Sequence, residues 1–454
     1  VAGSYGVYAQ NANNSSITHS TIDGTYSEAA IKMESCIGCT VNNNTMSNNP
    51  YRGIWMDQGF NTTITNNTMD VDYYGIQTND GSYYTLSGNT ITINNITNLS
   101  SCRGIYFNSS EYCTLNNNTI TITNHSYDFY AIVNWSNNSN AIVNGNTIDA
   151  TLYDSLQCNF YDNNGSSYSA NYIYGIYLYD AQEINSNTIL IDQRSYGSAI
   201  YVQQYNSNNV DLDIENNHIE VFARYHYTDQ GSIYCYSDNS YSGDISIKNN
   251  TIELYGGGQA GIQAYTNTDI IGNTISYSQN RYINGNNCSV YQTGDYLKGL
   301  NLYGDHNIIS GNTITNFAHG IRLNGVTDIV VDSNTIQTIS SITNTNGYTS
   351  NFSSGNLYGI EAQSCDSLFI TNNTITTETG PLIYQTNGAS TIKYNLLETE
   401  SGRGIWCENQ AGVEFSNNTI VSTNGNGDYG IHVSNLSAPI IKNNIVDNFQ
   451  NGIY

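Results

Sequence analysis

The sequence predicts an all-β chain wound as a right-handed parallel β-helix, a β-solenoid of roughly sixteen coils with loop insertions. Three observations lead to this fold class. A short unit recurs along the whole chain, apolar residues alternate with polar ones inside the unit, and clusters of Asn, Gly and Ser interrupt the alternation. Because a solenoid grows in one dimension by adding coils, we expect residues 1–454 to form a single domain.

Each unit has a glycine half and an asparagine half. In the shortest units, Met46 and Met69 are 23 positions apart, and Met69 and Ile91 are 22 apart. A coil therefore needs about 22 residues, and longer spacings are a coil plus an insertion. The glycine half includes Gly53-Ile54, Gly75-Ile76, Gly104-Ile105, Gly175-Ile176, Gly261-Ile262, Gly404-Ile405 and Gly430-Ile431, and the asparagine half includes Asn43-Asn44-Thr45, Asn66-Asn67-Thr68, Gly88-Asn89-Thr90, Asn117-Asn118-Thr119 and Asn249-Asn250-Thr251.

Short strands separated by tight corners explain the composition of a unit. Alternation such as Val210-Asp211-Leu212-Asp213-Ile214 is typical of a half-buried strand. Asn and Gly suit the corners because both tolerate a left-handed backbone. One coil cannot bury its own isoleucines, so we expect neighbouring coils to stack, with the repeat asparagines in ladders that satisfy buried backbone groups.

The units resemble the parallel β-helix repeat of pectate-lyase-like proteins and of surface proteins of the copper-protein-maturation type, over essentially the whole chain. This resemblance implies the fold but no single function, since the scaffold serves lyases, hydrolases, epimerases, adhesins and structural proteins. Composition and repeat style also resemble the Asn- and Thr-rich β-helix proteins of methanogenic archaeal envelopes, including an amyloid-like sheath protein.

Charge and composition restrict the partners. The chain has 12 Lys and Arg against 37 Asp and Glu, a formal net charge of −25. Nucleic acids and anionic membranes attract clustered cations, so neither is an expected partner. No apolar run approaches the length of a membrane span. The neutral surface of Asn, Ser, Thr and Tyr favours an extracellular, cell-surface location, where sequons such as Asn61-Thr62-Thr63 and Asn134-Trp135-Ser136 are candidates for glycosylation.

The nine cysteines and the two ends of the chain suggest self-association. The odd number of cysteines leaves two interpretations open, buried thiols inside the coils or interchain disulfides. Both ends lie in the same repeat phase without a capping segment, which predicts end-to-end assembly or else a chain trimmed at both ends. The interchain candidates are Cys36, Cys39, Cys102, Cys113 and Cys407, and the candidate end residues are Tyr5, Gly6, Val7, Tyr8, Gly452, Ile453 and Tyr454.

An acidic patch is the best candidate for catalysis. Aligned on their isoleucines, the coils place Glu183 beside Asp213 and Asp269, and Asp211 beside Asp244. Such carboxylates suit glycoside hydrolysis or a Ca²⁺ site, although the net charge of −25 favours an ordinary acidic solvent face. Asn267-Thr268-Asp269 and Ala318-His319-Gly320-Ile321-Arg322 resemble fragments of polygalacturonase motifs, but the chain has no Asp-Asp pair, Gly-His-Gly or Arg-Ile-Lys. We therefore expect no enzyme, and no cofactor apart from Ca²⁺ at this patch.

Outward aromatic residues form the remaining pattern. Tyr177, Tyr201 and Tyr234 follow the isoleucine in three coils and predict a ladder that binds glycans or a neighbouring subunit. Arg52 and Arg103 each precede a Gly-Ile-aromatic triplet, as does Arg403, and an arginine beside an aromatic ring suits a sugar acid. The three arginines are not expected to converge, because Arg52 and Arg103 are two coils apart and Arg403 is near the other end.

These observations favour an extracellular structural protein of a cell envelope that polymerises with copies of itself through exposed solenoid edges. Two alternatives remain, a secreted polysaccharide-active enzyme that uses the acidic patch and a glycan-binding adhesin that uses the tyrosines.

Overall fold

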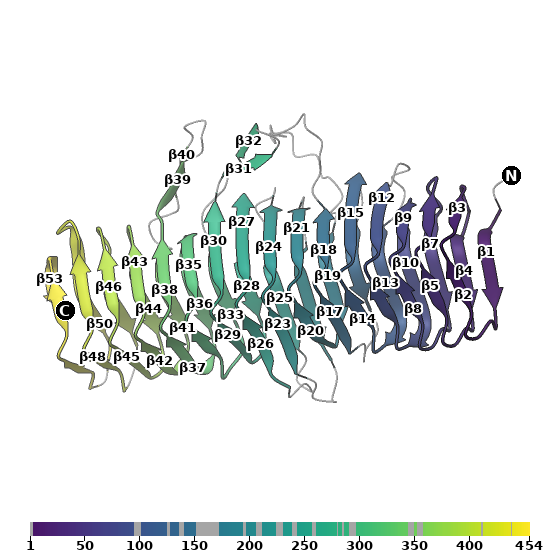
Figure 1. The fold of residues 1–454 in the computed structure, drawn as a ribbon. Coiled ribbons are helices and arrows are strands. Elements are labelled where there is room, and N and C mark those ends of the chain that lie inside the picture. Colours follow the sequence, from purple (N-terminus) through teal and green to yellow (C-terminus); the bar gives the residue numbers. More distant parts are fainter. Residues whose placement is uncertain are drawn as a thin grey trace. The chain divides into compact units, whose positions relative to one another are not determined.

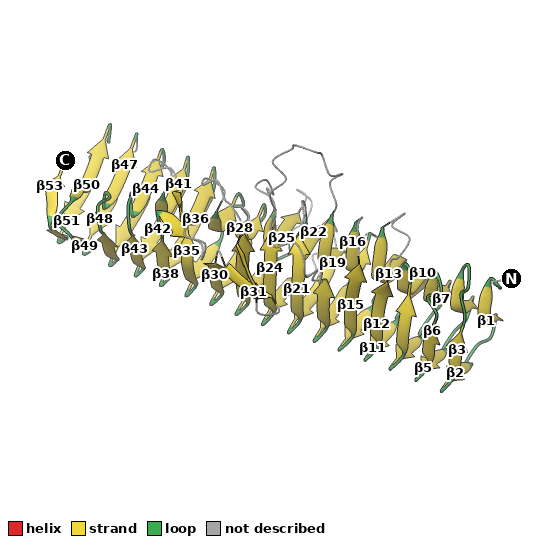
Figure 2. Ribbon diagram, turned by 90° about the horizontal axis from the view of Figure 1, so that it is seen from above, coloured by secondary structure: helices red, strands yellow, loops and turns green. Residues whose placement is uncertain are grey.

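The computed structural model of the chain is a right-handed parallel β-helix, which confirms the predicted fold class. It describes residues 3–94, 101–124, 128–135, 140–150, 172–193, 197–205, 211–223, 230–237, 243–256, 260–278, 280–283, 286–289, 297–343, 349–351, 357–409, 412–436 and 438–454. These residues form strands and loops without any helix (Figure 2), so none of them belongs to a helix long and apolar enough to cross a membrane.

Three parallel sheets, A, B and C, contain 17, 16 and 16 strands among the described residues. Sheet A comprises β1 (Tyr5–Gln10), β4 (Ala29–Glu34), β7 (Arg52–Asp57), β10 (Tyr74–Ser82), β13 (Cys102–Glu111), β16 (Phe129–Asn134), β19 (Ile173–Tyr179), β22 (Ile200–Gln204), β25 (Gly231–Ser237), β28 (Ala260–Ala264), β33 (Lys298–Leu302), β36 (His319–Asn324), β41 (Tyr358–Gln363), β44 (Ile383–Thr386), β47 (Ile405–Glu408), β50 (Gly427–Ser434) and β53 (Phe449–Ile453).

Sheet B comprises β2 (Ser16–Thr18), β5 (Thr40–Asn42), β8 (Thr63–Thr65), β11 (Thr85–Ser87), β14 (Thr114–Asn116), β17 (Ala141–Asn144), β20 (Ala181–Asn185), β23 (Leu212–Glu215), β26 (Ile245–Lys248), β29 (Thr268–Ile271), β34 (Ile308–Ser310), β37 (Thr327–Asp332), β42 (Asp366–Thr371), β45 (Ser390–Lys393), β48 (Glu414–Ser416) and β51 (Ile440–Lys442).

Sheet C comprises β3 (Thr21–Asp23), β6 (Thr45–Ser47), β9 (Thr68–Val71), β12 (Thr90–Asn94), β15 (Thr119–Asn124), β18 (Thr147–Ala150), β21 (Thr188–Gln193), β24 (His218–Ala223), β27 (Thr251–Gly256), β30 (Thr274–Ser278), β35 (Thr313–Phe317), β38 (Thr335–Thr338), β43 (Thr374–Thr377), β46 (Leu396–Thr399), β49 (Thr419–Ser422) and β52 (Ile445–Asp447).

Two antiparallel hairpins stand apart from the three sheets (Figure 1). They pair β31 (Asn280–Ile283) with β32 (Asn286–Ser289) and β39 (Ser341–Thr343) with β40 (Thr349–Asn351). Both are insertions between coils, as the variable repeat length predicts.

The chain divides into two compact units, each made of stacked coils. The N-terminal unit consists of the described residues within Val1–Gln157, Tyr161–Val221 and Cys235–Gly243, and the C-terminal unit of those within Phe222–Tyr234 and Asp244–Tyr454. The single domain expected from the sequence stays a prediction.

The glycine half of the repeat begins the strands of sheet A because the backbone there approaches its neighbours closely. A Cβ atom on Gly75 would lie 2.4 Å from Cγ2 of Ile91 in sheet C and 2.6 Å from the carbonyl oxygen of Gly104 in the next coil. The isoleucine that follows, Ile76, points inward and is fully buried between Ile54 and Ile105 of the adjacent coils. Stacked isoleucines thus fill the coil interiors.

The asparagine half builds the predicted ladders at the corner between sheets B and C. In the N-terminal unit, Oδ1 of Asn89 accepts hydrogen bonds from the backbone N–H and from Nδ2 of Asn67, at 3.1 and 3.0 Å. Nδ2 of Asn89 donates to Oδ1 of Asn118 and to the backbone oxygen of Ile64. Equivalent contacts join Asn44, Asn67, Asn89, Asn118, Asn146, Asn187 and Asn217, and in the C-terminal unit Asn250, Asn273, Asn312, Asn334, Asn373, Asn395, Asn418 and Asn444.

The residue that precedes each ladder asparagine turns the corner. Asn66 has a φ of 53° and Gly88 a φ of 64°, in the left-handed region that Asn and Gly tolerate best. This requirement explains why Asn and Gly predominate at this position of the repeat, where Ser186, Ser333 and Tyr394 are the exceptions.

We expect Asn89→Ala to lower the free energy of unfolding by about 2–4 kcal/mol, because it leaves several buried ladder partners unsatisfied. Urea denaturation measures the change. Thr90→Ala, which truncates the exposed neighbouring side chain, is the control and should shift stability by less than about 0.5 kcal/mol. Equal effects of both substitutions would contradict a stabilising ladder.

Gln385 is a polar side chain in the apolar interior of the C-terminal unit. It is fully buried, neither its Oε1 nor its Nε2 has a hydrogen-bond partner in the part of the chain that the structure describes, and its register neighbours are Ala362 and Cys407. We expect Gln385→Met to raise the free energy of unfolding by about 1–2 kcal/mol, because it removes an unpaired buried amide at nearly constant volume. Thermal denaturation measures the change, with Thr386→Ala, on the outward face of the same strand, as the control. If Gln385→Met gives no gain in stability, the amide of Gln385 is satisfied in the folded protein.

Candidate functional site

The outward face of sheet A in the N-terminal unit carries a band of aromatic rings and cations. We call this band the cation–aromatic strip. Two register rows form it: Arg52, Tyr74, Arg103 and Tyr130 occupy the position before the Gly-Ile or Ala-Ile pair, and Lys32, Trp55 and Tyr106 the position after it. Trp135 follows the end of β16. The strip therefore consists of Lys32, Arg52, Trp55, Tyr74, Arg103, Tyr106, Tyr130 and Trp135.

Aromatic rings hold the two arginines of the strip. The Arg52 guanidinium lies 4.6 Å from the ring centroid of Trp55 and 5.1 Å from that of Tyr74. The Arg103 guanidinium lies 5.3 Å from the Tyr74 centroid and 4.5 Å from that of Trp135. Both arginines thus contact Tyr74, which lies on the coil between them. Arg52 and Arg103 are two coils apart, as expected, but the tyrosine on the coil between them contacts both guanidiniums.

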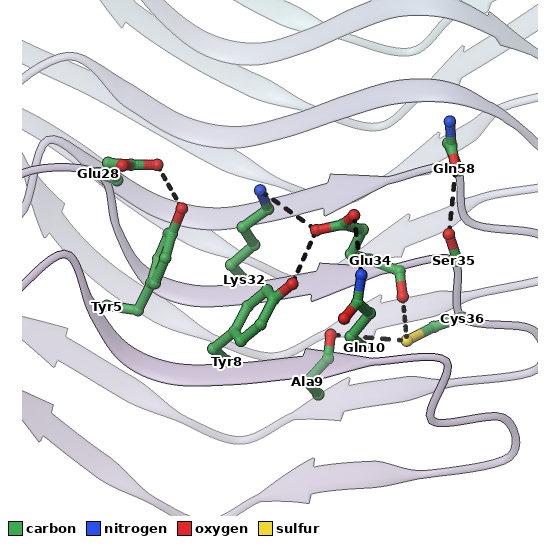
Figure 3. Close-up of polar contacts among 10 residues, drawn as sticks. All are labelled: Tyr5, Tyr8, Ala9, Gln10, Glu28, Lys32, Glu34, Ser35, Cys36 and Gln58. Carbon is green, nitrogen blue, oxygen red and sulfur yellow. Dashed lines mark hydrogen bonds and ion pairs between the residues drawn. The ribbon is translucent and has the colours of Figure 1, made fainter.

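The charges of the strip are unequally compensated. Nζ of Lys32 is 3.5 Å from Oε2 of Glu34, which also accepts a hydrogen bond from the Tyr8 hydroxyl (Figure 3). By contrast, Arg52 and Arg103 form no ion pair with any carboxylate of the described residues.

The hydrogen bonds of the two arginines are few. Nε of Arg52 donates to Oε1 of Gln77 at 2.6 Å and its Nη1 to the backbone oxygen of Glu28, while Nη1 of Arg103 donates to the Tyr74 hydroxyl at 2.7 Å. Burial lowers the pKa of Arg52 and raises that of Tyr130 to about 12. At neutral pH the guanidiniums are nevertheless charged and the phenol is neutral.

The predicted tyrosine ladder is tightly stacked where the structure describes it. Tyr177 and Tyr201 are register neighbours whose rings are 4.4 Å apart and 3° from parallel. Their hydroxyl groups contact neighbours on their own strands: that of Tyr177 is 3.3 Å from the Tyr179 hydroxyl, and that of Tyr201 donates to Oε1 of Gln203 at 3.4 Å. Tyr234 is in the C-terminal unit, where its ring centroid is 5.6 Å from that of Tyr265. Its predicted contact with Tyr201 therefore stays a prediction.

An exposed aromatic ridge lies at the corner that follows sheet A in the N-terminal unit. Phe60, Tyr83 and Tyr112 are 47, 49 and 44 % exposed, and the rings of Tyr83 and Tyr112 stack at 5.0 Å. Tyr83 and Tyr112 have φ values of 59° and 53°, which are uncommon for bulky residues. The repeat did not predict this ridge, because nothing in its pattern places a tyrosine at a corner that Asn, Ser or Gly occupies in other coils.

The acidic patch lies on sheet B rather than beside the strip. Glu183 and Asp213 are register neighbours on β20 and β23, as predicted, and Glu183 accepts hydrogen bonds from Asn144 and Asn185 at 2.9 and 2.8 Å. Asp211 is exposed in the same unit. The C-terminal unit holds Asp244, which is exposed, and Asp269, which is register-paired with Ser246. Within the described ranges, no three His, Cys, Asp or Glu side chains are close enough to hold a metal ion.

The five cysteines proposed for interchain bridges lie inside the coils. Cys36, Cys39, Cys102, Cys113 and Cys407 are free thiols that are at most 1 % exposed. Burial raises the pKa of Cys39 and that of Cys113, the latter to about 12, which disfavours the thiolate needed for exchange. This placement argues against interchain disulfides and favours the other interpretation, buried thiols that fill the core.

The candidate end residues lie in the first and last strands of sheet A or directly after them, and the sequon residue Asn134 lies in β16. Tyr5, Gly6, Val7 and Tyr8 lie in β1, which pairs with β4, and Gly452 and Ile453 lie in β53, which pairs with β50. Tyr8, Ile453 and Tyr454 are 48, 57 and 66 % exposed. End-to-end assembly through them stays a prediction. Asn134 is fully buried, so its sequon is not a glycan acceptor in the folded chain.

A buried charged cluster on sheet A of the C-terminal unit joins β36 to β41. Oε2 of Glu361 lies 3.3 Å from Nδ1 of His319 and 3.2 Å from Nε of Arg322, and Oε1 accepts a hydrogen bond from Gln363 at 2.6 Å. His319 and Glu361 are each 4 % exposed. The cluster includes the His-Gly-Ile-Arg segment that resembles a polygalacturonase motif. The Glu361 carboxylate, however, is enclosed and ion-paired, so the cluster stabilises the sheet rather than facing a ligand.

Comparison with known proteins supports the fold. Residues 1–99 match the model of the family described as periplasmic copper-binding protein (NosD), and residues 279–454 match that of the right-handed beta helix region. Each match covers less than half of the chain, and no curated protein matches it. Copper prefers imidazole, thiolate or thioether ligands, and among the described residues no three His, Cys, Asp or Glu side chains are close enough to hold a metal ion.

Solved structures give distant likenesses. A double mutant of the tailspike of E. coli bacteriophage HK620, in complex with a pentasaccharide, is 10 % identical, with 83 % of this chain and 66 % of that chain covered and a TM-score of 0.39. The alginate lyase AlyF-OU02 is 11 % identical (81 and 80 %, TM-score 0.37), and PfbA, a surface adhesin of Streptococcus pneumoniae, is 10 % identical (83 and 83 %, TM-score 0.27). Likenesses at this level assign no activity.

The Glu361 cluster predicts a pH-dependent stability. Burial alone would raise the pKa of Glu361, but its contacts with His319 and Arg322 hold it below the ordinary value of 4.5. The carboxylate therefore stabilises the fold above about pH 4.5, and this contribution is lost as the pH falls toward the lowered pKa. We expect Glu361→Gln to cost about 3 kcal/mol at pH 7 and less at pH 3–4, measured by urea denaturation. A pH-independent difference, or an equal effect of Glu398→Gln on sheet C, would contradict this.

Proposed function

We propose that the protein is a surface-associated polysaccharide-binding protein of adhesin type that acts outside the cytoplasm and holds its ligand along the cation–aromatic strip. The observation that carries this proposal is the strip itself: two adjacent rows of rings and cations repeated from coil to coil on one partly exposed sheet face.

The geometry of the strip suits an extended polymer. Successive coils are about 4.8 Å apart, close to the length that one pyranose ring adds to a linear polysaccharide. Guanidiniums and phenol groups offer donors for sugar hydroxyls, and the apolar rings exclude water from these contacts. Trp135 is 37 % exposed and provides an open aromatic surface beside Arg103.

The two other hypotheses have weaker support. For a polysaccharide-cleaving enzyme, carboxylates would have to lie beside the bound sugar, whereas Glu183 and Asp213 lie on sheet B and the strip on sheet A. Self-assembly into an amyloid-like envelope polymer stays a prediction from composition and repeat style, and the buried cysteines remove one of its supports.

We expect Trp135→Ala to weaken polysaccharide binding about tenfold or more without lowering the melting temperature by more than a few degrees. Affinity electrophoresis against a panel of neutral and acidic polysaccharides measures the binding. Phe369→Ala, which removes a ring that is 47 % exposed on sheet B of the C-terminal unit, is the matched control.

The same panel separates the strip from the aromatic ridge. Loss of binding with Tyr112→Ala but not with Trp135→Ala would place the ligand on the ridge instead. Failure of the wild-type protein to bind any polysaccharide of the panel would refute the proposed function.

A further inference from the structure

We infer that the ligand of the strip is an anionic polysaccharide whose acid groups are bound by Arg52 and Arg103. This inference rests on the proposed function and narrows its ligand class. Neutral sugars need hydroxyl donors and acceptors, whereas two guanidiniums two coils apart, with no carboxylate ion-paired to them among the described residues, select carboxylate or sulfate groups.

The distribution of cations along the chain is the first support. Residues 1–193 contain only three Lys and Arg, namely Lys32, Arg52 and Arg103. All three lie in the strip, on β4, β7 and β13, although the remaining outward faces of these coils offer many other positions. In a chain with a net charge of −25, cations dispersed for solubility would not gather on one face.

The state of the two guanidiniums is the second support. Arg52 uses Nε and Nη1 in its protein hydrogen bonds, and Arg103 uses Nη1 alone. Each guanidinium has five N–H donors, so donors of both arginines have no acceptor among the described residues, although Nε of Arg103 is itself buried. The rings of Trp55, Tyr74 and Trp135 lie 4.5–5.3 Å from the guanidiniums and restrict them, which lowers the entropy that is lost when an acid group binds in bidentate fashion.

The spacing of the arginines is the third support. Arg52 and Arg103 both pair in register with Tyr74, one from each side, so they are separated by two coils or about 10 Å. Acid groups two sugars apart on one polysaccharide chain lie at a comparable distance. A single ligand chain that runs across the strands can therefore engage both guanidiniums, and the second contact forms at high effective concentration.

Repulsion between the negatively charged chain and an anionic ligand does not outweigh the contacts with Arg52 and Arg103 at physiological ionic strength. Charges beyond a Debye length of about 8 Å are largely screened, so distant carboxylates oppose the ligand weakly. Two acids lie near the strip (Figure 3). Glu34 is occupied by Lys32 and Tyr8. Glu28, whose charge acts on Arg52, accepts a hydrogen bond from the Tyr5 hydroxyl. Local pairing with Arg52 and Arg103 therefore decides the selectivity.

The first test uses the wild-type protein and two pairs of probes that differ only in charge. Polygalacturonate is compared with its fully methyl-esterified form, and dextran sulfate with dextran, by biolayer interferometry in 150 mM salt. We expect at least one anionic polymer to bind ten times more tightly than its neutral counterpart. The pair that shows the difference identifies carboxylate or sulfate as the acid group.

The second test uses arginine variants. We expect Arg52→Gln and Arg103→Gln each to weaken binding of the anionic polymer about tenfold, and Arg103→Lys to restore only part of it, because lysine keeps the charge but not the bidentate geometry. Arg403→Gln is the matched control. Arg403 also precedes a Gly-Ile-Trp segment and lies 4.0 Å from the Trp406 ring. On the neighbouring strands β44 and β50, however, no second arginine is in register with it. This control should bind like the wild type.

Two results would overturn the inference. Equal binding of charged and neutral polymers, unchanged in Arg52→Gln and Arg103→Gln, would refute anion recognition while leaving polysaccharide binding intact. Anion-selective binding that is lost in Arg403→Gln but not in the two strip variants would place the acid site in the C-terminal unit. If no polymer of either charge binds, the proposed function itself fails.

Discussion

The asparagine ladder is the interaction on which the rest of the structure depends. A corner of a β-helix coil buries backbone groups that no sheet can satisfy, and an unpaired buried N–H or C=O costs about 1–3 kcal/mol. A ladder asparagine such as Asn89 accepts from one neighbouring coil and donates to both, so the corner is satisfied only when successive coils are in register. The ladder therefore links local chemistry to the alignment of every coil within a unit.

Register in turn creates the outward rows. Once Ile54, Ile76 and Ile105 stack inside the coils, the residues on either side of the Gly-Ile pairs must align outside them. Side chains that are up to 51 residues apart in sequence, such as Arg52 and Arg103, then share one aromatic neighbour. The alignment of the strip residues is thus a direct consequence of core packing. The chemistry of the strip depends only on which residue types occupy the outward positions of three or four successive repeats.

The repeat was sufficient to predict the fold class, the coil length, the ladders and the pairing of Glu183 with Asp213, because all of these follow from a period of about 22 residues. It did not predict the strip. Counting coils correctly placed Arg52 and Arg103 two coils apart. It did not show that both side chains are long enough to contact the ring of Tyr74 on the coil between them. The repeat also did not predict whether the cysteine side chains are buried, since its periodicity does not tell whether a residue near a corner points inward or outward.

The sequence by itself determined the β-helix, because hydrophobic alternation and corner residues are local properties that repeat in every unit. Only the tertiary structure decided which surface residues act together, since contacts between coils depend on side-chain reach and on insertions of unequal length. Tyr83 and Tyr112 illustrate this limit: their stacking at a left-handed corner arises from the superposition of two coils, and neither segment alone contains it.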